Sequence, residues 1–163
     1  MPTFSAEVLT RFAANLLATG GLSPEEATTV ARDLVAANLR GYDSHGLVRI
    51  PQYVTQMEKG GLVPGAPFEV LCEGPSTLAA DAHWGCGLVQ ARRLTERLMD
   101  KARNTGVGVG TMICSGHVGR LGEYCEMAVA GGLVGMMMVN NHGAVHRVSP
   151  PGGRASRLST NPL

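Results

Sequence analysis

The first forty residues carry apolar side chains at helical spacing. Residues 5–18 repeat them every three or four positions, at Val8, Phe12, Leu16 and Leu17. This period predicts an amphipathic helix, which the glycine pair that follows should end. A second helix is predicted from Ser23 to about Leu39, because an N-cap serine, a proline at the first helical position and an early glutamate form a helix start signal.

The rest of the chain alternates between strand and helix patterns. Two short β-rich runs, residues 68–72 and 77–80, flank the turn Gly74-Pro75-Ser76 and predict a hairpin. The elements predicted after it are a helix over 87–104, a strand over 107–114, a helix over 120–130 and a buried strand over 133–139. This order predicts helices that cover a sheet of mixed strand direction, an α/β or α+β architecture.

The pattern changes at a connector that contains Pro64 and Pro67. We therefore divide the chain into two parts. Residues 1–66 are predicted to form a helical segment that carries a substrate motif, and residues 67–163 to form a sheet domain.

Composition excludes several classes of function. The net charge is +1 without a local cluster of Lys or Arg, and aromatic residues make up 4%, so neither binding along nucleic acid nor base stacking is expected. The longest apolar run, residues 133–139, is too short to span a bilayer, and the amino terminus shows no secretory signal. The four cysteines lack metal-site spacing. We expect a cytoplasmic protein that binds neither nucleic acid nor membrane.

Residues 43–53 (Asp-Ser-His-Gly-Leu-Val-Arg-Ile-Pro-Gln-Tyr) are the strongest candidate for chemistry. His45, Arg49 and Tyr53 follow at steps of four, so a continuous helix would project all three from one face. An arginine fork matches a carboxylate, and an imidazole can move a proton at neutral pH. The segment predicts a site for a small carboxylic acid. The alternative is a solvated face with an ordinary charge pair, because Pro51 can restart the helix and change the register.

A second candidate is His117, in the run Ser-Gly-His-Val-Gly at residues 115–119. It lies between a predicted strand and a predicted helix, at the end of a sheet where ligand sites often form. We expect its glycine neighbours to let a substrate or cofactor approach the backbone, and the free N–H groups at the helix start to suit an anion. The alternative is a loop histidine without a role.

Other patterns are weaker. Glycines at 106, 108 and 110 precede a strand instead of following one, which excludes a Rossmann fingerprint; we expect them to mark a flat face for close packing. His142 and His146 have ligand spacing but no acidic or cysteine partner at motif distance, so no metal is expected. Polar residues at 140–142 and 159–162 either line a ligand cleft or form turns.

Taken together, these segments resemble the malate/L-lactate dehydrogenase family of the second, non-Rossmann type, which includes ureidoglycolate and sulfolactate dehydrogenases. The matching stretches are Leu39-Arg40-Gly41, Asp43-Ser44-His45-Gly46 with Arg49, Ser115-Gly116-His117 with Gly119, Pro150-Pro151-Gly152-Gly153-Arg154, and Thr160-Asn161-Pro162-Leu163. The resemblance implies an oxidoreductase that transfers a hydride between NAD or NADP and a small 2-hydroxy or 2-keto acid. It also implies a largely antiparallel, non-Rossmann sheet flanked by helices.

The resemblance implies roles for individual residues. His117 is implied to be the general acid/base, with His45 as the second catalytic candidate. The implied acid-binding residues are Ser44, Arg49 and Tyr53. The implied cofactor contacts are Asn141, Thr160, Asn161 and Pro162.

Family members are longer than this chain, so the resemblance also implies an incomplete sheet. An open sheet exposes unpaired backbone and apolar side chains. We therefore expect a homodimer or a partner that supplies the missing half. The competing hypothesis is a non-catalytic fragment or interaction module that retains the first half of the fold.

Overall fold

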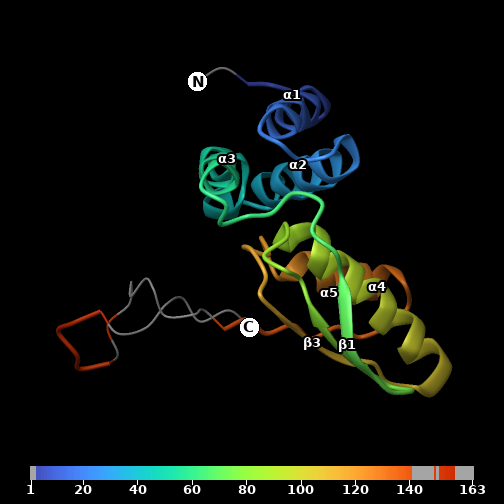
Figure 1. The fold of residues 1–163 in the computed structure, drawn as a ribbon. Coiled ribbons are helices and arrows are strands. Elements are labelled where there is room, and N and C mark those ends of the chain that lie inside the picture. The colour runs from blue at the N-terminus through green and yellow to red at the C-terminus, as the bar shows by residue number, and fades with distance from the viewer. Residues whose placement is uncertain (1–2, 141–148, 150, 157–163) are drawn as a thin grey trace.

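The computed structural model describes residues 3–140, 149 and 151–156 (Figure 1). Its helices are α1 (Ala6–Thr19), α2 (Pro24–Leu39), α3 (Ile50–Glu58), α4 (Gly87–Thr105) and α5 (Gly122–Ala130), with two 3-10 turns, η1 (Asp43–His45) and η2 (Leu47–Arg49). Its strands are β1 (Glu69–Glu73), β2 (Thr77–Asp81) and β3 (Val109–Ile113). None of the helices in the described ranges is long and apolar enough to cross a membrane.

The amino-terminal helices, called the helical unit below, share one core with Cys86, Leu88 and Val89 around the start of α4. Both predicted helix starts are confirmed: the Ser5 hydroxyl accepts from the Val8 N–H and the Ser23 hydroxyl from the Glu26 N–H. The core buries α1, α2 and α3 against one another through Leu17, Leu34 and Tyr53. This packing fixes α3 and the turns before it relative to α2.

The sheet has the order β1-β2-β3. β1 pairs antiparallel with β2, with a bulge between Val70 and Cys72, and β2 pairs parallel with β3. The predicted α/β class and the mixed strand direction are confirmed, with one antiparallel and one parallel pair among the described strands. α4 and α5 lie against one face of this sheet (Figure 1), and α4 is the connection that a parallel β2–β3 pair requires.

The glycine run before β3 serves packing, as predicted. A Cβ atom on Gly108 would lie 2.3 Å from the Leu98 carbonyl oxygen, and one on Gly110 would lie 2.8 Å from a Leu98 methyl group. Gly106 ends α4 in the left-handed conformation, with φ at 85°. These glycines bring β3 against α4.

The predicted buried strand over 133–139 is wrong. Within the described part of the chain this segment pairs with no strand, and alternate side chains face solvent: Val134 is 99% exposed and Met136 83%. The opposite side chains, Met137 and Val139, pack on the cluster around Tyr124. An apolar run becomes a buried strand only where a neighbouring strand and a second covering layer exist, and sequence pattern alone does not reveal either.

Candidate functional site

The site lies at the carboxyl edge of the parallel β2–β3 pair. The chain leaves both strands at this edge, and the two exits are tied together. The Trp84 N–H donates to the Cys114 carbonyl (2.6 Å), and the Gly116 N–H donates to the Gly85 carbonyl (3.1 Å). Trp84 and Cys114 both adopt positive φ, 58° and 48°, a strained conformation for side-chain-bearing residues that is frequent at functional sites.

Glycines let the loop that carries His117 lie directly on the start of α4. A Cβ atom on Gly87 would lie 2.1 Å from the Gly116 carbonyl oxygen, and one on Gly116 would lie 2.9 Å from the Gly85 carbonyl oxygen. Gly116 was expected to open the backbone to a ligand. Instead it opens the backbone to another stretch of backbone, which fixes the position of the next residue, His117.

Two groups contact Nδ1 of the His117 ring. Its Nδ1 atom lies 2.8 Å from the hydroxyl of Tyr53 on α3 and accepts from the Gly119 N–H at 3.3 Å. A backbone N–H can only donate, so this contact forms while Nδ1 carries no proton; a protonated Nδ1 can instead donate to the Tyr53 hydroxyl. Tyr53 is 1% exposed, so its hydroxyl contacts the imidazole from the protein interior and not from the solvent side.

His45 brings a second imidazole to the same place. The rings of His45 and His117 lie 5.4 Å apart between centroids, and the Ser44 hydroxyl lies 2.9 Å from His45 Nδ1. Partial burial, together with the nearby Arg49 guanidinium, lowers the pKa of His45. His45 is therefore neutral near pH 7 and can serve as a hydrogen-bond donor or acceptor beside His117.

Arg49 is oriented by neutral groups. Its Nε donates to the Ser44 carbonyl (2.5 Å) and its Nη1 to the Gln52 side-chain oxygen (2.7 Å). No carboxylate of the described residues forms an ion pair with it, so its positive charge remains available to a ligand. The sequence interpretation missed Gln52, although its position three residues after Arg49 is within reach on a helical turn.

The predicted continuous helix over 43–53 is wrong. The segment forms η1 and η2 separated by extended Gly46, and α3 begins at Ile50 with Pro51 in its first turn. The helix does restart with Pro51 in its first turn, but the alternative of a solvated face with a charge pair is not observed, since Tyr53 is buried. His45 and Tyr53 nevertheless meet at His117, because the fold, and not a shared helix face, brings them together.

Asn38 at the end of α2 secures this segment, and it too was missed. Its side-chain oxygen accepts from the Leu47 N–H (2.9 Å), and its amide donates to Asp43. A Cβ atom on Gly46 would lie 2.2 Å from that oxygen. The glycine of the Asp-Ser-His-Gly motif thus makes room for the Asn38 side chain.

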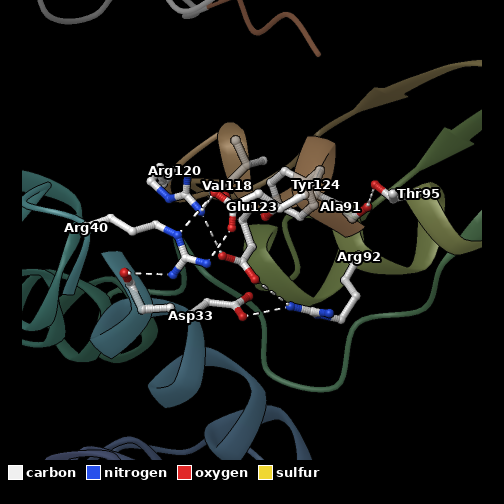
Figure 2. Close-up of polar contacts among 11 residues, drawn as sticks. Asp33, Arg40, Ala91, Arg92, Thr95, Val118, Arg120, Glu123 and Tyr124 are labelled. Carbon is white, nitrogen blue, oxygen red and sulfur yellow. Dashed lines mark hydrogen bonds and ion pairs between the residues drawn. The ribbon is translucent and has the colours of Figure 1, made fainter. Parts of the chain in front are cut away.

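A network of arginines and carboxylates braces the His117 loop from the other side (Figure 2). The Tyr124 hydroxyl donates to the Val118 carbonyl (2.5 Å). Arg120 contacts Glu126 (2.8 Å), and Glu126 in turn receives both Nε and Nη2 of Arg40 at the end of α2. The helical unit and the sheet unit are therefore linked beside the site.

Asp33 is the buried member of this network. One of its oxygens accepts from Arg92 (2.7 Å), which also contacts Glu123 (3.5 Å). Its other oxygen has no hydrogen-bond partner among the described residues. Burial raises the pKa of Asp33 to about 6, outweighing the opposing effect of Arg92. The ionised form is thus costly at neutral pH.

The predicted cofactor contacts Asn141, Thr160, Asn161 and Pro162 lie outside the described residues, as do His142 and His146. Their roles stay predictions. Among the residues that the structure does describe, no three His, Cys, Asp or Glu side chains form a group that could hold a metal ion.

Comparisons with known proteins identify the family of the chain. A family model described as malate/L-lactate dehydrogenase matches residues 4–163. The chain is 34% identical to L-sulfolactate dehydrogenase of Methanocaldococcus jannaschii over 88% of its own length and 41% of that protein. It is 33% identical to hydroxycarboxylate dehydrogenase B of Escherichia coli K12, over 98% of the chain and 44% of that protein.

A solved structure shares the fold. Malate dehydrogenase from Pyrococcus horikoshii OT3 superimposes with a TM-score of 0.79 at 34% identity, over 80% of this chain and 38% of that one. The chain spans about two fifths of the length of the relatives that it matches. With a family model matched over almost its whole length, the chain belongs to the malate/L-lactate dehydrogenase family.

Proposed function

We propose that this chain supplies the acid-binding and proton-transfer part of an NAD- or NADP-dependent oxidoreductase that interconverts small 2-hydroxy and 2-keto acids. One observation carries the proposal: the side chains of His45, Tyr53 and His117 meet at the edge of a parallel strand pair, next to the Arg49 segment. Family membership supports the same reaction class, since the matched relatives are dehydrogenases of hydroxy acids.

Arg49 and Ser44 are proposed to hold the carboxylate of the acid. The guanidinium is already oriented by Ser44 and Gln52, so little side-chain entropy is lost when it binds. His45, neutral at pH 7, adds a hydrogen bond without adding charge.

His117 is proposed to move the proton. In the reduction direction the charged imidazole gives its Nε2 proton to the carbonyl oxygen while the carbon receives a hydride, and oxidation reverses both transfers. The Tyr53 hydroxyl can donate to Nδ1 or accept from it, so it contacts the ring in either protonation state. Tyr53 is thus proposed to position His117, in place of the acid-binding role implied by the resemblance.

The nicotinamide cofactor would supply or accept the hydride. By resemblance, Asn141 and residues 160–162 would hold it. The described residues fit an aromatic cofactor at this edge, because the half-exposed indole of Trp84 offers a flat apolar surface for stacking.

Activity is proposed for a form in which the sheet is covered. The face opposite α4 and α5 exposes apolar side chains that folded proteins bury. On the strands, Leu71, Val109 and Ile113 are at least half exposed, and so are Val134 and Met136 on the segment after α5. A surface of this kind marks a contact with further polypeptide, and the matched relatives are more than twice as long. The same face favours the second candidate function, an interaction module without catalysis.

Cofactor binding separates the two candidates. Trp84 is the only tryptophan, and it is bonded to the His117 loop through Cys114, so titration with NADH or NADPH should quench its emission and excite nicotinamide fluorescence. The expected outcome is saturable energy transfer from Trp84 to the nicotinamide, followed by turnover of malate, lactate, sulfolactate or ureidoglycolate. No transfer with either cofactor, in a form whose sheet is covered, would favour the interaction module.

A further inference from the structure

Residues 43–53, which we call the acid-binding segment after the role proposed above, are attached near the His117 loop at both ends. At the carboxyl end, the Tyr53 hydroxyl lies 2.8 Å from Nδ1 of His117. At the amino end, Arg40 and Tyr42 contact side chains that follow the same loop. A segment attached at one point can pivot, whereas two attachments fix its orientation. The second attachment therefore controls how the segment faces His117.

Glu126 on α5 makes the contact at the amino end. Its Oε1 atom accepts from Arg40 Nε (3.1 Å) and contacts Arg120 Nη2 (2.8 Å), while its Oε2 atom accepts from Arg40 Nη2. Figure 2 shows the two arginine side chains approaching the same place, one from the end of α2 and one from the stretch before α5. Arg40 lies three residues before Asp43, and Arg120 three residues after His117. One carboxylate thus joins the two stretches of chain.

Arg120 adds a second contact to the same end of the segment. Its guanidinium carbon lies 5.8 Å from the centroid of the Tyr42 ring, within the range of a cation–π interaction. Tyr42 directly precedes η1. Only 11% of the Arg120 side chain is exposed, so packing as well as charge fixes its position. Glu126 orients this guanidinium, and through it the contact to Tyr42.

The charge of Glu126 allows the two arginines to lie together. Without it, Arg40 and Arg120 would bring two positive charges to one place, and these would repel each other. Because Arg120 is nearly buried, solvent screens the repulsion only in part. Arg120 would keep its contact to Glu123 (3.1 Å) and stay with α5. The repulsion would therefore displace Arg40 and the segment that follows it.

We propose that Glu126 is a positioning residue of the site. It joins the stretches of chain that carry His45 and His117, and so it sets how the two imidazole rings face each other. Its effect on turnover rests on the proposed function. Its effect on the rings, whose centroids lie 5.4 Å apart, is measurable without any reaction.

Nuclear magnetic resonance of the full chain provides that measurement. Glu126→Gln should shift the ring resonances of both His45 and His117 and remove most of the nuclear Overhauser effect between the two rings. Arg40→Gln should shift them less, because it leaves no unpaired like charges. The double variant Arg40→Gln/Glu126→Gln should lie closer to the unchanged chain than Glu126→Gln does, since the repulsion is then gone.

Glu73→Gln is the matched control. Glu73 is also about half exposed and forms an ion pair, at 2.7 Å with Lys101 beside the hairpin, so the same chemical change removes a similar pair away from the site. It should leave both histidine rings unchanged. Unshifted His45 and His117 resonances in Glu126→Gln, with folding checked by circular dichroism, would overturn the proposal. A double variant no better than Glu126→Gln would also overturn it, because lost contacts and not charge would then explain the change.

Turnover in a form whose sheet is covered separates this inference from the proposed function. Glu126→Gln should lower kcat/KM for the acid about tenfold, because misplaced groups react more slowly, and should leave the affinity for NADH unchanged. The double variant should recover most of that loss. Full kcat/KM in Glu126→Gln would refute the positioning role in an active protein. If no form turns over any acid while the histidine rings still respond, the proposed function fails and the positioning role stands.

Discussion

The hydroxyl of Tyr53 lies 2.8 Å from Nδ1 of His117, 64 residues away in the chain. This bond joins α3 of the helical unit to the loop after β3. Tyr53→Phe keeps the ring and removes the bond, so it should lower the free energy of unfolding by about 1 kcal/mol. In an active form of the protein it should lower kcat and leave KM for the acid nearly unchanged.

The control for this prediction is Tyr42→Phe, since the Tyr42 ring is exposed. A rise in KM with unchanged kcat in Tyr53→Phe would instead support the acid-binding role.

His117→Ala tests proton transfer. A general acid/base contributes typically 10²–10⁴-fold to rate, so kcat should fall by about that factor. Affinity for NADH, followed through Trp84 emission, should stay nearly intact because the backbone of residues 114–116 is held by Trp84 and Gly85. If kcat survives, the proton must pass through another group, and His45 is the next to replace.

Arg49→Lys tests recognition of the carboxylate. Lysine keeps the charge but loses the planar fork and the contacts to Ser44 and Gln52, so KM should rise for every accepted acid while kcat changes little. Gln52→Ala should raise KM by a smaller factor, because the fork then loses one of its two supports. Equal KM values in the unchanged protein, Arg49→Lys and Gln52→Ala would show that Arg49 does not bind the carboxylate.

Asp33→Asn tests the cost of the buried carboxylate. Folding raises the Asp33 pKa from 3.8 to about 6. The contribution of the protonated Asp33 to the free energy of unfolding is therefore fully present below pH 3.8 and is lost as the pH rises through 6. The variant carries no such loss. Its free energy of unfolding relative to the unchanged chain should therefore increase by roughly 2.5 kcal/mol between pH 4 and pH 7.5.

Urea unfolding at several pH values measures this difference. Asp100→Asn is the control, since it makes the same chemical change at an exposed position. A constant difference for Asp33→Asn would mean that its ionisation does not cost stability.

Gly87→Ala tests the contact between α4 and the His117 loop. Alanine usually stabilises a helix by about 1 kcal/mol relative to glycine, but here its Cβ would meet the Gly116 carbonyl at 2.1 Å. We expect the melting temperature to fall and the His117 imidazole resonances to shift. Gly61→Ala, where a Cβ has ordinary contact distances, should do neither.

Local signals in the sequence predicted most of the elements. The cap at Ser23 and the glycines at 106–110 act through neighbouring residues or through one packing contact, so pattern alone finds them. The geometry around His117 was not predictable in the same way. Tyr53 reaches it only after α3 packs on α2, and Asn38 supports residues 43–49 from a separate helix. Such contacts depend on tertiary packing, which spacing along the chain does not encode.

The link between Arg40 and Glu126 spans 86 residues, and it has a consequence for synthesis. A growing chain can complete the helices of residues 6–58 early, since their contacts are local, and such units fold as they emerge. The pairing of His45 and Tyr53 with His117 must wait until residue 117 has been made and its loop has packed beside α3. Until then both surfaces of the site face solvent, and this is the interval in which a nascent chain is most open to capture by chaperones.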